Sequence, residues 1–217
     1  AIIGHDEDFI ASARLDNLLS CYVACEALQQ ADSRVSSLIV CNDHEEVGSA
    51  SAAGAEGSFL KDILERIMPN TEIRLRTLAK SMLISTDNAH GIHPNFSGKH
   101  DSQHGPILNQ GPVIKINSNQ RYATSSETMA YFLSLCRKLD IPSQQFVTRT
   151  DLACGSTIGP ITAKTIGIKA VDVGVPTFAM HSIRELAGVK DAYLLLQALT
   201  AFTTALRPIS INSITGN

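Results

Sequence analysis

Residues 82–87 read Met-Leu-Ile-Ser-Thr-Asp, a short apolar run that ends on a carboxylate. The run predicts a strand over residues 82–86, because a few mainly apolar residues between polar segments are typical of a buried strand. Asp87 follows directly after this strand. Similar runs alternate with helical patterns along the chain, and this alternation predicts an α/β fold.

The pattern extends on both sides of this strand. We expect further strands at residues 9–13, 37–41, 113–117, 145–149, 170–173 and 177–180. We expect helices at residues 17–31, 57–67, 71–81, 126–139 and 189–206, and a short helix after the small-residue loop 151–159. Residues 87–111 form a long polar stretch, and loops of this length are usually functional. The order of the elements predicts a three-layer α/β/α fold with a mixed, mostly parallel sheet.

The composition is that of a folded protein. The chain has 217 residues, of which 44% are hydrophobic and 18% charged, and its formal net charge is −3. This profile excludes a disordered chain, and the lack of a basic run argues against nucleic acid or an anionic membrane as a partner. The apolar segment 192–206 is interrupted by Gln and Thr and is too short to cross a bilayer.

The five cysteines form no C-x-x-C pair. Their odd number and their spacing predict reduced thiols, and therefore a cytoplasmic location. Cys21, Cys25, Cys41 and Cys136 are expected to be small buried apolar side chains.

Acidic and His residues follow four of the expected strands. These residues are Asp16, the run 43–46, Asp87 and His181. Because ligands bind at the carboxyl ends of strands in open α/β sheets, the four positions are expected to converge. Carboxylates and imidazole are ligands that Zn²⁺, Mn²⁺ and Co²⁺ accept, so the sequence predicts a metal site at this edge.

The predicted site offers ligands to a pair of metal ions. A pair of ions about 3.5–4 Å apart needs one bridging carboxylate and further ligands on each side. Asp16 is suited to bridge, and Glu46 and His181 are suited to complete one site. Asp87 could help to hold the other ion. Glu45, beside Glu46, is suited to act as a general base.

Each of these residues also has a structural interpretation. The acidic pair Glu45-Glu46 is typical of a solvated turn. Asp16 could cap the following helix, and His181 could be an ordinary structural histidine. The agreement of four positions on one sheet edge favours the metal site.

Six blocks of sequence resemble, in the same order, the aspartyl aminopeptidase family. They are residues 14–17, 43–49, 85–95, 111–115, 154–160 and 180–185. The resemblance covers almost the whole chain. It implies a zinc-exopeptidase-like α/β fold (phosphorylase/hydrolase-like) that binds two zinc ions. It also implies an aminopeptidase that removes acidic residues from the amino termini of peptides. It also implies a homo-oligomer in the full-length protein.

The resemblance assigns roles to the predicted metal ligands. Asp16 resembles the bridging ligand, and Glu45 resembles the general base. Glu46 and His181 look like the terminal ligands of one metal. Asp87 looks like a terminal ligand of the other metal.

The resemblance also assigns a substrate pocket. His90 is similar to a histidine that lines the substrate site, and Lys115 and Tyr122 look like residues of the pocket for the acidic side chain. Without the resemblance, Lys115 is better interpreted as lying on the solvent face of its strand. The amides of loop 154–157 could hold a substrate oxyanion, although Ser156 or Thr157 could equally be a plain helix cap.

The chain departs from the family pattern at its amino-terminal side. The family has an upstream His-x-Asp ligand motif and an inserted oligomerisation domain, and nothing before Asp16 matches either. We therefore expect residues 1–217 to be the carboxyl-terminal portion of one metallopeptidase catalytic domain. By itself this portion is expected to bind one metal weakly or none, and to hydrolyse little.

The sequence leaves three alternative functions to compare. The first is a related dinuclear aminopeptidase of broader specificity. The second is a catalytically incomplete fragment with a structural role only. The third, a nucleotide-binding domain, is disfavoured because the chain has no Gly-rich strand-to-helix fingerprint, and the segment 155–159 lacks the Lys of a P-loop.

Overall fold

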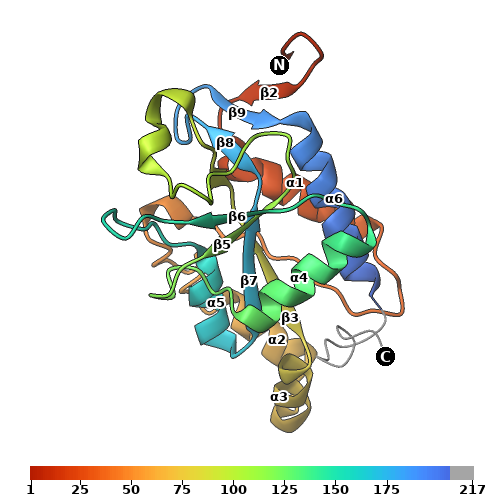
Figure 1. Ribbon diagram of the computed structural model, residues 1–217. Helices are drawn as coiled ribbons and strands as arrows, with labels where there is room; N and C mark the ends of the chain where they lie inside the picture. Colours follow the sequence, from red (N-terminus) through yellow and green to blue (C-terminus); the bar gives the residue numbers. More distant parts are fainter. Residues whose placement is uncertain (206–217) are drawn as a thin grey trace.

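The computed structural model describes residues 1–205, whose strands form two mixed sheets (Figure 1). The four-stranded sheet has the order β3 (Met82–Thr86), β7 (Lys169–Gly174), β5 (Val113–Ile116), β6 (Gln144–Val147). Two of its three pairings are parallel. The five-stranded sheet has the order β1 (Ile2–Ile3), β2 (Phe9–Ser12), β9 (Glu185–Gly188), β8 (Pro176–Phe178), β4 (Ala89–His90). In this sheet β4 and β8 are parallel and the other pairings are antiparallel.

The two sheets meet where β3 leads to β4 and β7 leads to β8. The backbone N–H of Asp87 donates to the carbonyl of Val173 at 3.0 Å, and that of Ala89 donates to Val175 at 2.9 Å. These bonds continue the pairing of β3 with β7 into that of β4 with β8. The mixed α/β prediction is confirmed, but the strands form two sheets joined at Asp87.

Helices cover both faces of the four-stranded sheet, as the three-layer prediction requires (Figure 1). One face carries α1 (Leu15–Gln29), α4 (Ser126–Lys138) and α6 (Val189–Thr204), and the other carries α5 (Ile158–Ile166). Side chains of β7 alternate between the two layers. Val171 and Val173 pack in the core with α1, α4 and α6, whereas Asp172 contacts the start of α5. The remaining helices are α2 (Phe59–Ile67), α3 (Thr71–Ala79) and the 3-10 helices η1 (Glu45–Val47) and η2 (Pro94–Lys99).

The expected strand at residues 37–41 is wrong. These residues form no strand, and Leu38 is 49% exposed. An apolar run becomes a strand when a sheet edge supplies hydrogen bonds to its backbone, and no strand within residues 1–205 does so here. Glu45 and Glu46 therefore follow an irregular segment and belong to η1.

The other expected elements are present, with ends that differ by at most two residues. Residue 206, the expected end of the last helix, lies outside the described residues. The long polar stretch contains β4 and η2, and the short strands β1 and β9 were not expected.

All five cysteines are free, and Cys136 is buried as expected. The prediction of burial is wrong for Cys25 and Cys41, whose side chains are exposed. No helix within the described part of the chain is long and apolar enough to span a membrane.

Candidate metal centre

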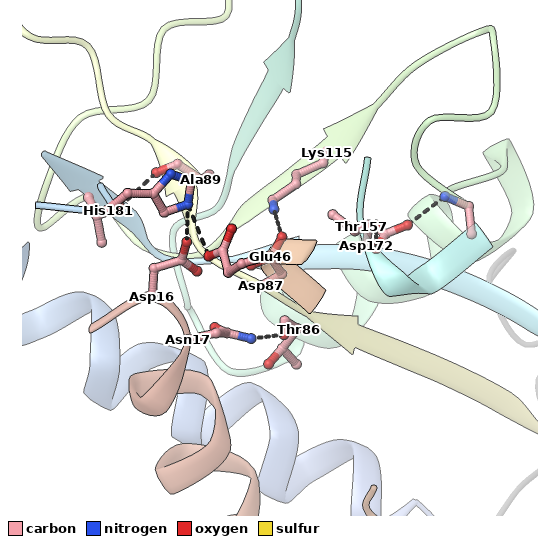
Figure 2. A network of polar contacts seen from close by, with 12 residues as sticks. Asp16, Asn17, Glu46, Thr86, Asp87, Ala89, Lys115, Thr157, Asp172 and His181 are labelled. Carbon is pink, nitrogen blue, oxygen red and sulfur yellow. Dashed lines mark hydrogen bonds and ion pairs between the residues drawn. The ribbon is translucent and has the colours of Figure 1, made fainter. Parts of the chain in front are cut away.

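Three residues that are far apart in the chain meet at one point (Figure 2). Asp16 lies at the start of α1, Glu46 lies in η1, and His181 lies in the turn after β8. The Nε2 atom of His181 is 3.2 Å from Oδ2 of Asp16 and 3.0 Å from Oε1 of Glu46. One ligand atom from each residue lies within 4.8 Å of the other two, so two carboxylates and an imidazole could hold one metal ion.

The side chain of Asp16 does not cap α1. Arg14 occupies the N-cap position, and the backbone of Asp16 is extended, with φ −85° and ψ 107°. The Asp16 side chain is 5% exposed, and its Oδ1 atom has no hydrogen-bond partner within residues 1–205. A buried carboxylate oxygen without a partner costs free energy, which a bound cation would offset. This unpartnered oxygen and the donor set both fit a metal ion such as zinc.

Negative charge accumulates around the three residues. Burial is the largest cause that raises the pKa of Asp16 to about 8, followed by the neighbouring carboxylates of Asp87 and Glu46, while Lys115 lowers it. The pKa of Glu45 is also raised, by burial first and then by Asp87 and Glu46. Like charges this close disfavour each other's ionised form, and a divalent cation would reverse the effect.

Lys115 lies beside this cluster, on β5. It is 3% exposed, so its interpretation as a residue of the solvent face is wrong. Its Nζ atom is 3.0 Å from Oδ2 of Asp87 (Figure 2) and 5.5 Å from the centre of the Tyr122 ring. Burial, followed by a hydrogen bond with Cys154, raises the pKa of Tyr122. Lys115 therefore contacts both a carboxylate and an aromatic ring in a largely dry setting.

His90 lies on β4, near the same charges. Its pKa is lowered, by loss of hydration first and then by the positive charges of Lys115, His100 and His181. Lys115 and His181 are therefore close enough to His90 to affect its pKa.

The loop before α5 is held by a buried carboxylate. Thr157 occupies the N-cap position of α5, but its hydroxyl makes no cap hydrogen bond and donates to Oδ1 of Asp172 at 2.7 Å (Figure 2). The backbone N–H of Ala123, next to Tyr122, donates to Oδ2 of Asp172. The expectation of a plain helix cap is therefore correct for the position of Thr157. It is wrong for the hydrogen bond, because the Thr157 side chain does not bond to the first turn of α5.

The family follows from a comparison with known protein families. A family model described as aminopeptidase I zinc metalloprotease (M18) matches residues 1–203. This chain belongs to the M18 family.

Curated relatives of the M18 chain are longer than it is. The probable M18 family aminopeptidase 2 of Pseudomonas savastanoi pv. phaseolicola is 59% identical over 202 residues, which cover 93% of this chain and 47% of the relative. The protein of the same name from Ectopseudomonas mendocina has the same identity and coverage. The chain therefore spans about half the length of the curated relatives it matches.

Solved structures share the fold of the M18 chain. The structure described as the complex of Ape4 and Nbr1 has a TM-score of 0.87 and 39% identity, covering 94% of this chain and 41% of that chain. The mApe1 dodecamer of S. cerevisiae has a TM-score of 0.80 and 29% identity, covering 93% of this chain and 47% of that chain.

Two of the six family-like blocks of sequence, residues 14–17 and 180–185, also contain supporting residues that were not predicted, Asn17 and Glu185. The Nδ2 atom of Asn17 donates to the carbonyl of Thr86 at 2.8 Å, directly before Asp87 (Figure 2). Glu185 is 1% exposed, and its carboxylate accepts the backbone N–H of Asp16. A charged residue directly before the small apolar run 186–188 is the signal that could have indicated Glu185.

Gly174, at the end of β7, packs against the backbone of Asp87. A Cβ atom at this position would lie 1.8 Å from the Asp87 carbonyl oxygen. We expect Gly174→Ala to displace Asp87 and to lower the free energy of unfolding by about 1–3 kcal/mol, as overpacking does. Urea denaturation of the metal-free protein measures this effect. Gly155→Ala is the matched control, because a Cβ there meets no atom within 4 Å. Equal stability of the two variants would contradict the prediction.

Proposed function

We propose that this chain carries the metal-binding core of an M18 aminopeptidase that removes acidic residues from the amino termini of peptides. The observation that carries the proposal is the meeting of Asp16, Glu46 and His181. Asp16 and His181 are 165 positions apart, yet their side chains lie within hydrogen-bond distance. A structural role would not explain why an oxygen of Asp16 is buried without a partner in residues 1–205.

The complete site is proposed to hold two zinc ions. Asp16, Glu46 and His181 would hold one ion, and Asp87 would help to hold the other, with Asp16 as the bridge. Asp87 is close enough to Asp16 to raise its pKa, which supports the shared role. Mn²⁺ and Co²⁺ are alternatives, because they accept the same donors. When bound, the metal supplies a Lewis acid that polarises the scissile carbonyl and makes water more acidic.

Glu45 is the proposed general base. Asp87, Glu46 and His181 are close enough to Glu45 to affect its pKa, which supports a position of its carboxylate beside the centre. We infer that it takes a proton from the attacking water and passes it to the departing amine. His90 is proposed to line the substrate site beside these groups.

Lys115 and Tyr122 are the proposed pocket for an acidic side chain. A buried ammonium group forms a strong charge-assisted hydrogen bond with a carboxylate. One observation favours the alternative of broader specificity: Lys115 is already paired with Asp87, so a substrate carboxylate would have to share its charge. A catalytically incomplete chain with a structural role only is the other alternative.

The setting of the enzyme is also proposed. We propose that residues 1–217 are the carboxyl-terminal portion of a larger catalytic domain, and their coverage of 47% of the curated relatives supports a partial domain. A similar protein is described as a dodecamer, which supports a homo-oligomer. The five free cysteines support a cytoplasmic location.

Replacing His181 tests the metal site. We expect His181→Ala to weaken zinc binding by at least about 100-fold, because loss of an outer partner of a ligand alone costs about 10–100-fold. Competition with a chromophoric chelator measures the affinity. His104→Ala is the control, because His104 also pairs with a carboxylate, that of Asp101, outside the centre. Wild-type zinc affinity in His181→Ala would refute the proposed site.

Replacing Glu45 tests the proposed base. We expect Glu45→Gln to lower kcat about 10²–10⁴-fold while zinc affinity stays unchanged, because the amide cannot accept the proton. Hydrolysis of an aspartyl-amide substrate and the chelator assay, both on the whole polypeptide that carries these residues, provide the two readouts. Asp43→Asn, which changes an acid whose side chain is 74% exposed, should retain kcat. If both variants keep wild-type kcat, Glu45 is not the base.

Replacing Lys115 tests the acidic preference. We expect Lys115→Ala to lower the ratio of kcat/KM for an aspartyl over an alanyl substrate by about 10-fold or more, the equivalent of one charged hydrogen bond. Taking the ratio cancels any loss of activity that is common to both substrates, such as the loss caused by leaving Asp87 without its ion-pair partner. Lys169→Ala, which breaks an ion pair with Glu127 elsewhere, should keep the wild-type ratio. A preserved ratio in Lys115→Ala would favour broader specificity.

A further inference from the structure

Glu185, the first residue of β9, holds the backbone of two candidate ligands at once. Its Oε2 atom accepts the N–H of Asp16 at 2.7 Å, and its Oε1 atom accepts the N–H of His181 at 2.6 Å. The side chain is 1% exposed and makes no ion pair with any residue in 1–205. One buried carboxylate therefore joins two peptide groups that are 165 positions apart.

The sheet topology explains why Glu185 can reach the backbone N–H groups of both Asp16 and His181. β9 lies between β2 and β8 in the five-stranded sheet. The chain after β2 leads to Asp16, and the chain after β8 leads to His181. The start of β9 is therefore the point of the sheet that adjoins both turns.

Neither Asp16 nor His181 is held in its turn by a regular helix or sheet hydrogen bond from its own N–H group. Asp16 has an extended backbone inside the span of α1, so its N–H belongs to no helical hydrogen bond. His181 has φ 70°, in the left-handed region that residues other than glycine seldom adopt. In both cases the N–H is satisfied by Glu185, and hydrogen bonds to a charged acceptor are the stronger kind.

We propose that Glu185 is a positioning residue that presents Asp16 and His181 to the same metal ion. This inference rests on the proposed function. Partners that orient metal ligands normally bind the ligand's side chain, and their loss typically costs about 10–100-fold in metal affinity. Glu185 instead binds the backbone N–H groups of Asp16 and His181, and so fixes the backbone position from which each ligand side chain extends.

The chain offers a matched control in Asp191. Asp191 is also fully buried, and its two oxygens accept the N–H groups of Asn109 at 2.6 Å and Gly111 at 2.7 Å. It makes the same kind of two-point bond, but joins no candidate ligand. A change from carboxylate to amide at either position removes one acceptor, and at Asp191 the effect on the metal centre should be absent.

The test compares zinc affinity in Glu185→Gln and Asp191→Asn, in the whole polypeptide that carries these residues. We expect Glu185→Gln to bind zinc about 10–100-fold more weakly at a temperature well below its unfolding transition. Asp191→Asn should bind zinc like the wild type. With Co²⁺ as the probe, the visible absorption spectrum should change in Glu185→Gln and remain unchanged in Asp191→Asn, because the spectrum reports ligand geometry.

Glu185→Asp covers the case in which Glu185→Gln does not fold. Its shorter side chain keeps the charge but cannot reach both N–H groups, so the same loss of zinc affinity is expected. Wild-type affinity and spectrum in a folded Glu185 variant would overturn the proposal, as would an equal loss in Asp191→Asn. If neither Glu185 variant folds while Asp191→Asn does, Glu185 serves the fold and the proposal is wrong. Failure of the wild type to bind zinc, or wild-type affinity in His181→Ala, would instead refute the proposed function.

Discussion

A buried carboxylate beside other carboxylates requires positive charge, and Asp16 is in this position. Asp87 and Glu46 lie near enough to raise its pKa, and one of its oxygens has no partner within residues 1–205. Lys115 compensates Asp87 through an ion pair of 3.0 Å, but within residues 1–205 Asp16 and Glu46 pair only with the His181 ring and with no Lys or Arg. The proposed metal supplies this charge, and the chemistry of the site depends on it.

The location of the centre follows from the way the two sheets meet. β3 and β7 continue into β4 and β8 through backbone hydrogen bonds around Asp87. Gly174 allows the two chains to approach closely at this point. The junction brings Asp87 and Lys115 from the four-stranded sheet next to the turns of the five-stranded sheet that carry Asp16 and His181. Both sheets are therefore needed to build the site.

The charged residues around the centre divide into those that would contact ligands and those that hold the backbone. Glu45, Lys115 and His90 lie where a substrate would be bound under the proposed function. Within residues 1–205, Asn17 and Glu185 bind only peptide groups beside or within the ligand residues. This division explains why buried polar groups that contact no substrate are still expected to affect metal affinity.

The sequence by itself determined the α/β class, the helices, most strands and the residue types of the centre, because apolar periodicity and strand-end carboxylates are local properties. Tertiary structure alone decided that residues 37–41 form no strand, since a strand also needs a partner edge. It decided that Lys115 is buried, because both faces of β5 are covered and alternation cannot then distinguish its sides. It also decided the role of Glu185, since a bond between residues 169 positions apart depends on the order of strands in the sheet, which no local pattern contains.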